Sequence, residues 1–178
     1  MEVNRESMEY DVVIVGAGPS GLATAIKIKQ LNSETNVCIL EKGSEVGAHI
    51  LSGNVFETKA LDELIPDWKI KNAPIKTKVK KEKFLFLSNN SSLSWPTWLL
   101  PSVQKNHNNY IISLANLCRW LATEAENLGV EIFPGFAASK ILFSDDDQVI
   151  GIQTGDMGVD KDGNKKDSFE PGINIMAK

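Results

Sequence analysis

The clearest hydrophobic pattern lies near the N-terminus, where two short apolar runs flank an amphipathic segment. Residues 11–15 and 37–40 are almost entirely apolar, which predicts strands that are buried on both faces. Residues 19–31 carry apolar side chains at helical spacing and begin with proline, which predicts a helix. The apolar face of this helix comprises Leu22, Ala25 and Ile26. Strand, helix and strand within about thirty residues predict a βαβ unit and therefore a parallel sheet.

The remaining pattern predicts shorter elements. Residues 58–68 predict a short amphipathic helix, and residues 111–128 predict the longest helix, with Gly129 as its stop. The predicted strands are 84–87, 130–133 and 173–177, and residues 141–143 and 149–153 form a predicted hairpin. A turn is predicted over 88–92, an apolar loop over 95–101 and a polar loop over 155–168.

Composition narrows the class of protein. The 178 residues are 42% apolar and 24% charged, as in ordinary globular domains, and the length allows one domain or slightly more. A net charge of −4 argues against a dedicated nucleic-acid-binding protein. No apolar run reaches the 18 residues of a membrane-spanning helix, and the acidic N-terminus predicts no signal peptide.

The two cysteines, Cys38 and Cys118, are too few for a four-thiolate cluster or a disulfide framework. One falls in the second predicted strand and the other on the longest predicted helix, so both are expected in the core. Asp160, Asp162 and Gly163 superficially resemble a calcium loop, but the glycine comes two positions early and no glutamate closes the loop. We therefore predict no metal site.

The motif that carries chemistry is the segment Gly16-Ala17-Gly18-Pro19-Ser20-Gly21, which fits the G-x-G-x-x-G fingerprint. It lies between the first predicted strand and the first helix. Gly16 permits a tight turn, Gly18 allows the backbone to approach a pyrophosphate, and Gly21 allows close packing of helix on strand. The free N–H groups and the dipole of the helix N-terminus favour phosphate there.

Glu41 follows Gly21 by twenty residues, at the end of the second predicted strand. A carboxylate in this position accepts hydrogen bonds from an adenosine ribose and repels a 2′-phosphate, which disfavours NADP. The fingerprint does not separate FAD from NAD. A second glycine-rich stretch, with Gly43, Gly47 and Gly53, leans toward FAD, although an ordinary loop would look the same.

Several longer segments resemble electron transfer flavoprotein–ubiquinone oxidoreductases. These segments are Glu41–Gly53, Leu64–Trp68, Asn108–Ile111, Gly129–Gly135 and Gly155–Gly158 followed by Lys161-Asp162-Gly163. The resemblance runs from about Tyr10 to Lys178. It implies an α/β fold, a Rossmann-like FAD-binding domain that begins with βαβ, with an inserted β-rich segment.

The resemblance also implies a division of the chain and a set of cofactor contacts. Residues 10–53 form the first FAD-binding segment, 54–106 an inserted quinone- or membrane-side segment, and 107–178 a continuation of the FAD domain. The expected FAD-binding residues are Gly16, Gly18, Pro19, Ser20, Gly21, Glu41, Lys42, Gly47, Ala48, Ser52 and Gly53. No catalytic acid or base is expected, because the flavin carries the redox chemistry. His49 lies in the loop expected near the flavin, but structural hydrogen bonding is the plainer interpretation for His49 and for His107. Arg119 is expected to be exposed or ion-paired.

The implied activity is electron transfer from reduced electron transfer flavoprotein to ubiquinone. A [4Fe–4S] cluster is expected only in a C-terminal part that this sequence does not contain. The chain then resembles the front portion of a longer flavoenzyme, and the strand at 173–177 would be a cut edge prone to aggregation. A geranylgeranyl-reductase-like FAD oxidoreductase and a noncatalytic dinucleotide-binding remnant remain as alternatives.

The resemblance further implies monotopic association with the inner face of a bacterial cytoplasmic membrane or with the mitochondrial inner membrane. The expected surface, here called the candidate face, comprises Leu61, Leu64, Ile65 and Trp68. Seven lysines follow it between residues 69 and 83, as suits an anionic membrane. Trp95, Trp98, Leu99 and Leu100 are a second candidate wedge. Core packing is the alternative for both clusters.

Overall fold

The computed structural model describes residues 4–161 and 163–178, so Asp162 of the rejected calcium pattern lies outside the described residues. The chain divides into two compact units. The first contains residues up to Ile50 and from Cys118 onward, and the second contains Leu51–Leu117. The second unit overlaps the predicted insert of 54–106 and extends past it. The functional boundaries proposed from the sequence stay a prediction.

The first unit begins with two strands and the expected helix. Strand β1 (Ser7–Tyr10) was not predicted, whereas β2 (Val12–Val15), α1 (Pro19–Leu31) and β3 (Val37–Glu41) confirm the βαβ start. Strands β2, β3 and β9 (Glu131–Pro134) form a wholly parallel sheet in the order β2-β3-β9. The predicted apolar face of α1 is completely buried.

One detail of this sheet differs from the prediction. Strand β3 is buried along Val37–Leu40, but β2 is only half-buried and Val15 is 61% exposed. The reason is position, because β3 lies between two strands whereas β2 is at an edge of the described sheet. The apolar run of β2 therefore did not by itself report burial on both faces.

A second sheet in this unit has the order β1-β14-β11-β10. It combines β10 (Ala138–Phe143) and β11 (Val149–Thr154), which confirm the predicted hairpin, with β14 (Asn174–Ala177). Strand β14 pairs in parallel with β1 and antiparallel with β11. The expectation that this strand is a cut edge is therefore wrong, because both of its sides are hydrogen-bonded and Ile175 is buried.

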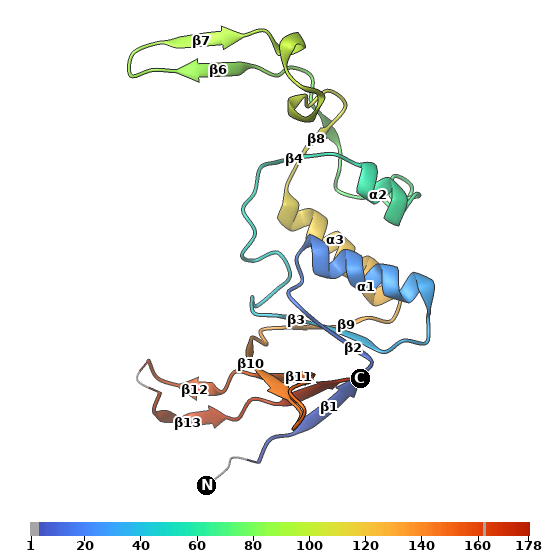
Figure 1. Cartoon of the computed structure of the whole chain (residues 1–178), viewed down its shortest axis with the longest axis vertical. Helices are drawn as coiled ribbons and strands as arrows, with labels where there is room; N and C mark the ends of the chain where they lie inside the picture. The colour runs from blue at the N-terminus through green and yellow to red at the C-terminus, as the bar shows by residue number, and fades with distance from the viewer. Residues whose placement is uncertain (1–3, 162) are drawn as a thin grey trace. The chain divides into compact units, whose positions relative to one another are not determined.

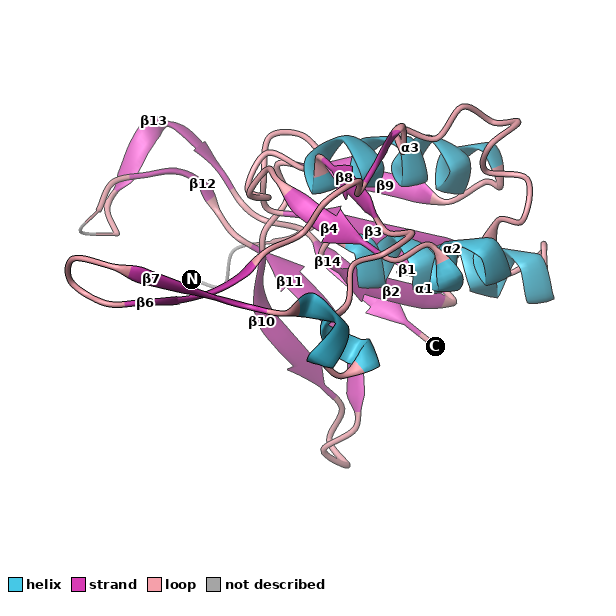
Figure 2. Cartoon of the chain, turned by 90° about the horizontal axis from the view of Figure 1, so that it is seen from above, coloured by secondary structure: helices cyan, strands magenta, loops and turns pink. Residues whose placement is uncertain are grey.

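The two sheets and the helices form layers within the first unit. Helix α1 and the parallel sheet are adjacent, and the β1-β14-β11-β10 sheet lies on the other side of the parallel sheet (Figures 1 and 2). A buried cluster joins the two sheets. It contains Tyr10, Cys38, Leu40, Ile152 and Ile175, contributed by β1, β3, β11 and β14.

The segment predicted as a polar loop over 155–168 contains two further strands. Strands β12 (Met157–Val159) and β13 (Lys165–Glu170) pair antiparallel and form a second hairpin (Figure 1). Strand β12 has only three residues, Met-Gly-Val, and β13 is polar apart from Phe169, so neither strand shows apolar alternation over four or more residues. The polar-loop prediction is wrong for this reason.

The second unit contains short elements. They are β4 (Asn54–Phe56), α2 (Lys59–Leu64), β5 (Thr77–Lys78), β6 (Phe84–Leu87), β7 (Ser92–Trp95), η1 (Thr97–Leu99), η2 (Ser102–Gln104) and β8 (Tyr110–Ile112). Strands β4, β8 and β5 form one antiparallel sheet, and β6 and β7 form a hairpin that Figure 1 draws in green. Helix α2 ends at Leu64 rather than at residue 68, and its C-cap Ile65 is the residue before Pro66.

Helix α3 (Leu114–Asn127) starts three residues later than predicted. Ile111 and Ile112 instead belong to β8, where they pair with residues of β4. Two adjacent β-branched residues fit a strand better than a helix, and this preference outweighed the apparent helical spacing. The helix ends at Asn127, one residue before the predicted end, and Gly129 is in the left-handed region at φ +84, as expected for a residue that stops a helix.

Candidate functional site: a glycine turn and its carboxylate

The glycine motif forms the turn between β2 and α1. Gly16 has φ +102, a value that side chains disfavour, and its N–H donates to Leu40 O at 2.7 Å. A Cβ at Gly16 or Gly18 would meet nothing within 4 Å. A Cβ at Gly21 would lie 2.1 Å from Gly16 O, so this position requires glycine for packing. The turn therefore combines open space at its first two glycines with close contact at its third.

The N-terminus of α1 has the properties of an anion site. Gly18 is the N-cap and supplies no side-chain hydrogen bond, and the first turn contains no acidic residue. Among the described residues, no acceptor is bonded to the N–H groups of Ser20 and Gly21. These amides and the helix dipole favour a negatively charged group beside the turn.

Glu41 joins the glycine turn to the loop after β3. Its Oε2 accepts a hydrogen bond from Ala17 N at 2.9 Å, and its Oε1 accepts one from Gly43 N at 2.8 Å. Gly43 is buried, and a Cβ on it would lie 3.1 Å from Glu41 Oε1. Each carboxylate oxygen has a second lone pair, so the bridge leaves Glu41 able to accept from a ligand hydroxyl.

The loop after Glu41 is held at two further points. Gly135 N, just after β9, donates to Gly43 O at 2.7 Å, and Arg119 Nη2 lies 2.9 Å from Glu45 Oε1. Arg119 is thus ion-paired, as expected. Gly47 is buried with φ +85, whereas Lys42, Ala48 and His49 are exposed.

The structure brings together some of the predicted site residues and leaves others untested. Gly16, Gly18, Pro19, Ser20, Gly21 and Glu41 meet at the turn. Ser52 and Gly53 belong to the second unit, so their role stays a prediction. Sequence reasoning left Gly43 and the Ala17 amide out of the expected contact residues. The second glycine-rich stretch was the available signal for Gly43.

These features fit an adenine dinucleotide with a diphosphate. Open space lies over the first two glycines, the first-turn amides have unused hydrogen-bonding capacity, and a carboxylate is anchored beside them. The open space lets the diphosphate approach the backbone, the amides can bind its charge, and the carboxylate can accept a hydrogen bond from a ribose hydroxyl. The residues present therefore fit the cofactor that the sequence predicts.

The cysteines confirm the expectation of core positions. Cys38 and Cys118 are both 0% exposed. Burial raises the pKa of the Cys38 thiol to about 12 and that of the Cys118 thiol to about 11. Such thiols are neither nucleophiles nor accessible ligands at neutral pH.

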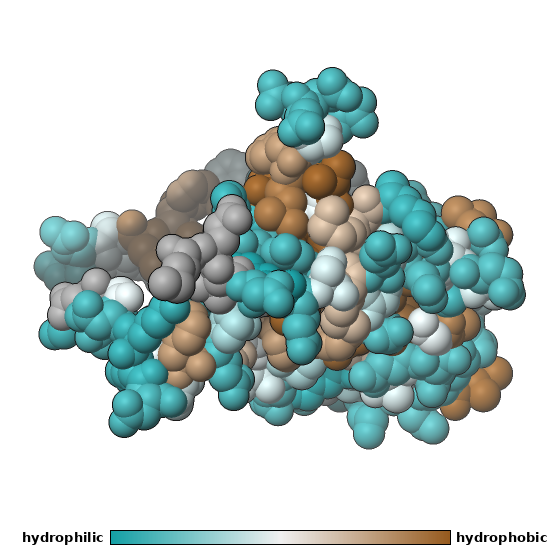
Figure 3. Space-filling model, turned by 90° about the horizontal axis from the view of Figure 1, so that it is seen from below, coloured by the Kyte–Doolittle hydropathy of each residue, from teal (hydrophilic) through white to brown (hydrophobic). Residues whose placement is uncertain are grey.

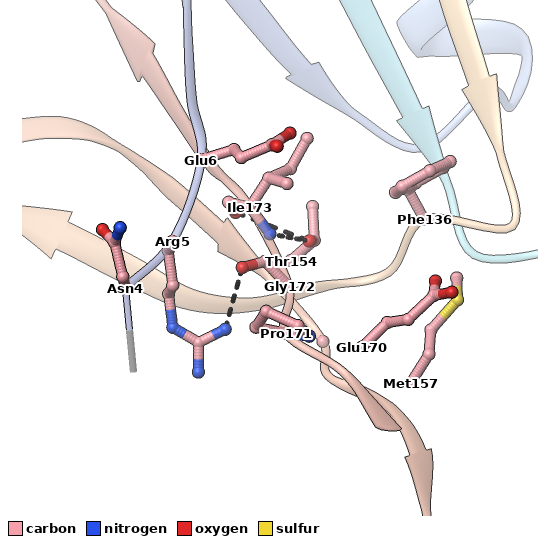
Figure 4. Close-up of a pocket in the computed structure, with 11 residues that line it drawn as sticks. Asn4, Arg5, Glu6, Phe136, Thr154, Met157, Glu170, Pro171, Gly172 and Ile173 are labelled. Carbon is pink, nitrogen blue, oxygen red and sulfur yellow. Dashed lines mark hydrogen bonds between the residues drawn. The ribbon is translucent and has the colours of Figure 1, made fainter. Parts of the chain in front are cut away.

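A separate pocket of about 510 Å³ lies in the first unit, between the N-terminal segment and the start of β14 (Figure 4). Arg5 donates to Asp156 and to Gly172 O, and Gly172 N donates to Asp156 Oδ1 at 2.8 Å. The Arg5 and Gly172 bonds lower the pKa of Asp156 to about 2. None of the predicted cofactor residues lines this pocket. Arg5 and Thr154, two of the lining residues, form hydrogen bonds to the backbone of Gly172 and Ile173, which indicates that both have a structural role.

The candidate face is wrong as a membrane surface. Leu61, Ile65 and Trp68 are 3–4% exposed and Leu64 is half-buried, so protein rather than lipid covers most of this face. Trp68 Nε1 donates to Asp62 at 2.7 Å and its ring meets Tyr110 edge to face, both within the second unit. Helical spacing shows which side of a helix is apolar but not whether protein or lipid covers it. The second candidate wedge is divided, because Leu100 is buried while Trp95, Trp98 and Leu99 are exposed.

Comparison with known proteins places this site in context. The chain is 52% identical over 178 residues to the mitochondrial electron transfer flavoprotein-ubiquinone oxidoreductase of Oryza sativa, covering 98% of the chain and 30% of that protein. It is 54% identical over 182 residues to the probable electron transfer flavoprotein-ubiquinone oxidoreductase of Acinetobacter baylyi, covering 99% of the chain and 32% of that protein. The chain is homologous to the N-terminal portion of electron transfer flavoprotein–ubiquinone oxidoreductases. It spans about 30% of the length of these relatives.

More distant similarities support the fold. A model of the Thi4 family matches residues 1–88. A geranylgeranyl bacteriochlorophyll reductase-like protein from Thermoplasma acidophilum has a TM-score of 0.64 and 18% identity, covering 97% of this chain and 38% of that one. A myxobacterial chondrochloren halogenase, a variant of FAD-dependent halogenases, has a TM-score of 0.61 and 14% identity, with 95% and 36% covered. The fold is that of FAD-dependent oxidoreductases, of which the chain covers a part. No helix among the described residues is long and apolar enough to cross a membrane.

Proposed function

We propose that this chain holds the adenosine and diphosphate part of FAD in an electron transfer flavoprotein–ubiquinone oxidoreductase. The observation that carries the proposal is the Glu41 bridge, with its 2.9 Å bond to Ala17 N beside the open space over Gly16 and Gly18. The bridge couples the carboxylate to the phosphate-binding turn. Sequence identities of 52% and 54% to two electron transfer flavoprotein-ubiquinone oxidoreductases support the assignment to this oxidoreductase.

The proposed roles of the residues follow from their chemistry. The amides of Ser20 and Gly21 hold the diphosphate charge, and Gly18 allows the backbone to approach it. Glu41 accepts from the ribose hydroxyls through its remaining lone pairs and repels a 2′-phosphate. Lys42, Gly47, Ala48, Ser52 and Gly53 are the proposed contacts farther along the dinucleotide. FAD, when bound, supplies the redox chemistry, and the protein supplies placement and electrostatics.

The proposed donor and acceptor are those named by the relatives, electron transfer flavoprotein and ubiquinone. Cys38 and Cys118 do not ligate a cluster in this proposal, because both thiols are buried in the core. A [4Fe–4S] cluster would need ligands from sequence that is absent from this chain. A geranylgeranyl-reductase-like oxidoreductase shares the fold, but its 18% identity gives that alternative no support beyond the fold.

Membrane association is proposed on the β6–β7 hairpin in place of the candidate face. The cross-strand pair Phe86 and Leu93 is 53% and 65% exposed, and Leu87 is 77% exposed. Lys80, Lys81 and Lys83 precede β6 and are exposed. Exposed apolar side chains beside cations suit the interface of an anionic membrane. The proposed location is the inner face of a bacterial cytoplasmic membrane or the mitochondrial inner membrane.

FAD retention tests the cofactor site directly. We expect the purified chain, reconstituted with FAD, to retain the flavin at one equivalent after gel filtration. Gly18→Asp should abolish retention, because its carboxylate would occupy the place of the phosphate. Gly155→Asp adds the same charge at a position where a Cβ has only ordinary contacts, and it should retain FAD. Loss of FAD in both variants, or in neither, would contradict the site.

Electron exchange tests the identity of the donor. Reduced electron transfer flavoprotein, added without oxygen, should bleach the FAD absorbance of the loaded chain. FAD that is bound in the stated way but not reduced would favour the alternative oxidoreductase. A chain that retains no flavin would favour the noncatalytic remnant.

Sedimentation with anionic vesicles tests the hairpin. Phe86→Ser with Leu93→Ser should weaken binding on the order of tenfold, because two interfacial apolar side chains are lost. The matched control is Phe143→Ser with Val149→Ser, another exposed cross-strand pair at 55% and 63%. At the top of Figure 3, where the β10–β11 hairpin lies, a hydrophilic projection has exposed hydrophobic residues at its base. Equal losses in the two double variants would contradict the hairpin assignment.

A further inference from the structure

A pocket of about 350 Å³ in the second unit combines aromatic and cationic walls. We name it the lysine pocket, and its polar and aromatic lining consists of Trp68, Lys69, Asn72, Lys76, Lys78 and Tyr110. The buried residues Ala73 and Ile75 complete the lining. The lining contains three lysines and no acidic residue. The pocket is therefore a place of positive potential.

Two of the lysines lie over aromatic rings. Lys69 Nζ lies 5.1 Å from the centroid of the Trp68 ring, and Lys78 Nζ lies 5.8 Å from that of Tyr110. The rings of Trp68 and Tyr110 meet edge to face, with their centroids 6.1 Å apart. Because cation–π contacts favour a charge over the ring face, these contacts hold both ammonium groups beside the pocket. The lysines are therefore partly positioned before any ligand arrives.

The backbone beneath the lysines is a closed turn. Ala73 N donates to Trp68 O at 3.0 Å, and Lys71 N donates to Asp67 O at 3.0 Å. Asn72, between them, has φ 56. Lys69 lies within this turn and Lys76 follows it, while Lys78 is on β5 and pairs with Tyr110 of β8. The three lysines thus come from backbone that is held by hydrogen bonds.

The acidic side chains near the pocket are engaged elsewhere. Asp62 accepts from Trp68 Nε1 at 2.7 Å and from the Thr58 hydroxyl at 2.9 Å. These two hydrogen bonds lower the pKa of Asp62, and the positive charge of Lys69 lowers it by a smaller amount. Asp67 Oδ2 lies 3.8 Å from Lys71 Nζ. Neither carboxylate lines the lysine pocket, so neither neutralises it from within.

We propose that the lysine pocket binds a phosphate monoester. A monoester carries a charge of about −1.5 to −2 at pH 7, which matches the three lysines that line the pocket better than the single charge of a carboxylate does. Lysine binds phosphate as a point charge, and Asn72 can donate a further hydrogen bond. The chemistry is the same for a soluble phosphorylated metabolite and for the monoester headgroup of a lipid. The proposal does not depend on FAD binding.

Calorimetric titration with glycerol 3-phosphate tests the soluble source. The triple variant Lys69→Gln, Lys76→Gln and Lys78→Gln should weaken binding on the order of fivefold for each lysine and about 100-fold together. The control triple Lys59→Gln, Lys140→Gln and Lys166→Gln removes the same charge from exposed positions outside the pocket. It should bind within about twofold of the unmodified chain, as expected for surface charges remote from the site. A urea midpoint for each variant verifies that it is folded.

Vesicles test the lipid source. Phosphatidylcholine vesicles that contain phosphatidic acid, a monoester, are compared with vesicles of equal surface charge that contain phosphatidylglycerol, a diester. If the headgroup is the ligand, the pocket triple should lose its preference for phosphatidic acid, whereas the control triple should keep it. Binding of glycerol 3-phosphate that is lost only in the pocket triple supports the proposal and identifies a soluble ligand. A preference for phosphatidic acid that is lost only in the pocket triple supports the proposal and identifies a lipid headgroup.

Three outcomes would overturn the proposal. The first is that neither glycerol 3-phosphate nor phosphatidic acid vesicles bind preferentially to the unmodified chain. The second is equal weakening by the pocket and control triples, which would mean bulk charge alone. The third is pocket-dependent binding of poly-glutamate without binding of either monoester, which would identify an acidic protein surface as the occupant.

Discussion

Arg5 and Asp156, which are 151 positions apart in the sequence, form a bidentate ion pair. Arg5 Nη1 lies 2.5 Å from Asp156 Oδ1, and Arg5 Nη2 lies 3.2 Å from Oδ2. Arg5 Nη1 also donates to Gly172 O at 2.9 Å. The pair therefore connects the N-terminal segment to the two ends of the β12–β13 hairpin.

This pair predicts a specific dependence of stability on pH. The pKa of Asp156 is lowered from 3.8 to about 2, so its ionised form stabilises the fold above about pH 4, and this contribution is lost as the pH falls toward 2. Asp156→Asn should lower the free energy of unfolding at neutral pH and flatten its decline between pH 4 and 2. Urea unfolding at several pH values measures both effects. Asp146→Asn, in the exposed β10–β11 turn, should leave the profile unchanged.

Replacing a glycine of the turn by alanine should affect stability at one position and FAD binding at another. Gly21→Ala places a Cβ 2.1 Å from Gly16 O and should lower the free energy of unfolding by about 1–3 kcal/mol through overpacking. Gly18→Ala meets nothing within 4 Å, so it should leave the unfolding midpoint nearly unchanged while weakening FAD binding. Urea unfolding and flavin retention, measured on both variants, separate the two roles. Equal destabilisation by both would contradict the assignment.

The cysteines predict a thiol reactivity that reports folding. With the pKa of Cys38 raised to about 12 and that of Cys118 to about 11, both thiols stay protonated and buried at pH 8. A thiol-labelling reagent should therefore modify neither in the native chain and both in denaturant. Labelling of one thiol in the native state would show that its part of the core opens locally. Cys118→Ser and Cys38→Ser then identify which thiol reacts.

Trp68 predicts a stability effect where the sequence suggested a membrane contact. Trp68→Ser should lower the free energy of unfolding by about 3–5 kcal/mol, because it removes a buried indole that is 3% exposed and its bond to Asp62. Trp98→Ser, at a position that is 74% exposed, should change it by less than about 0.5 kcal/mol. Urea unfolding without vesicles gives both values. A change as small as that at Trp98 would contradict the buried position of Trp68.

Local pattern was sufficient for the dinucleotide-binding start and insufficient for pairing. Val37–Leu40, the α1 face and the glycine spacing are short-range features, and all three are confirmed. Strand β1 was missed although Met8 and Tyr10 alternate with polar residues, because a four-residue run is a weak signal and its partner β14 lies far along the chain. The Glu41 bridge was predicted as a position but not as a contact, since its bonds to Ala17 and Gly43 depend on how two loops meet.

The pairing of β1 with β14 has a consequence for synthesis. Tyr10 is in register with Ala177, and β14 is the one neighbour of β1 in its sheet among the described residues. At translation rates of about 5–20 residues per second, β1 leaves the ribosome about 8–30 s before its partner exists. The parallel sheet of β2, β3 and β9 needs no residue beyond Pro134, so it can assemble while β1 still waits. In the nascent chain, β1 therefore stays without its β14 partner until residues 174–177 have been added.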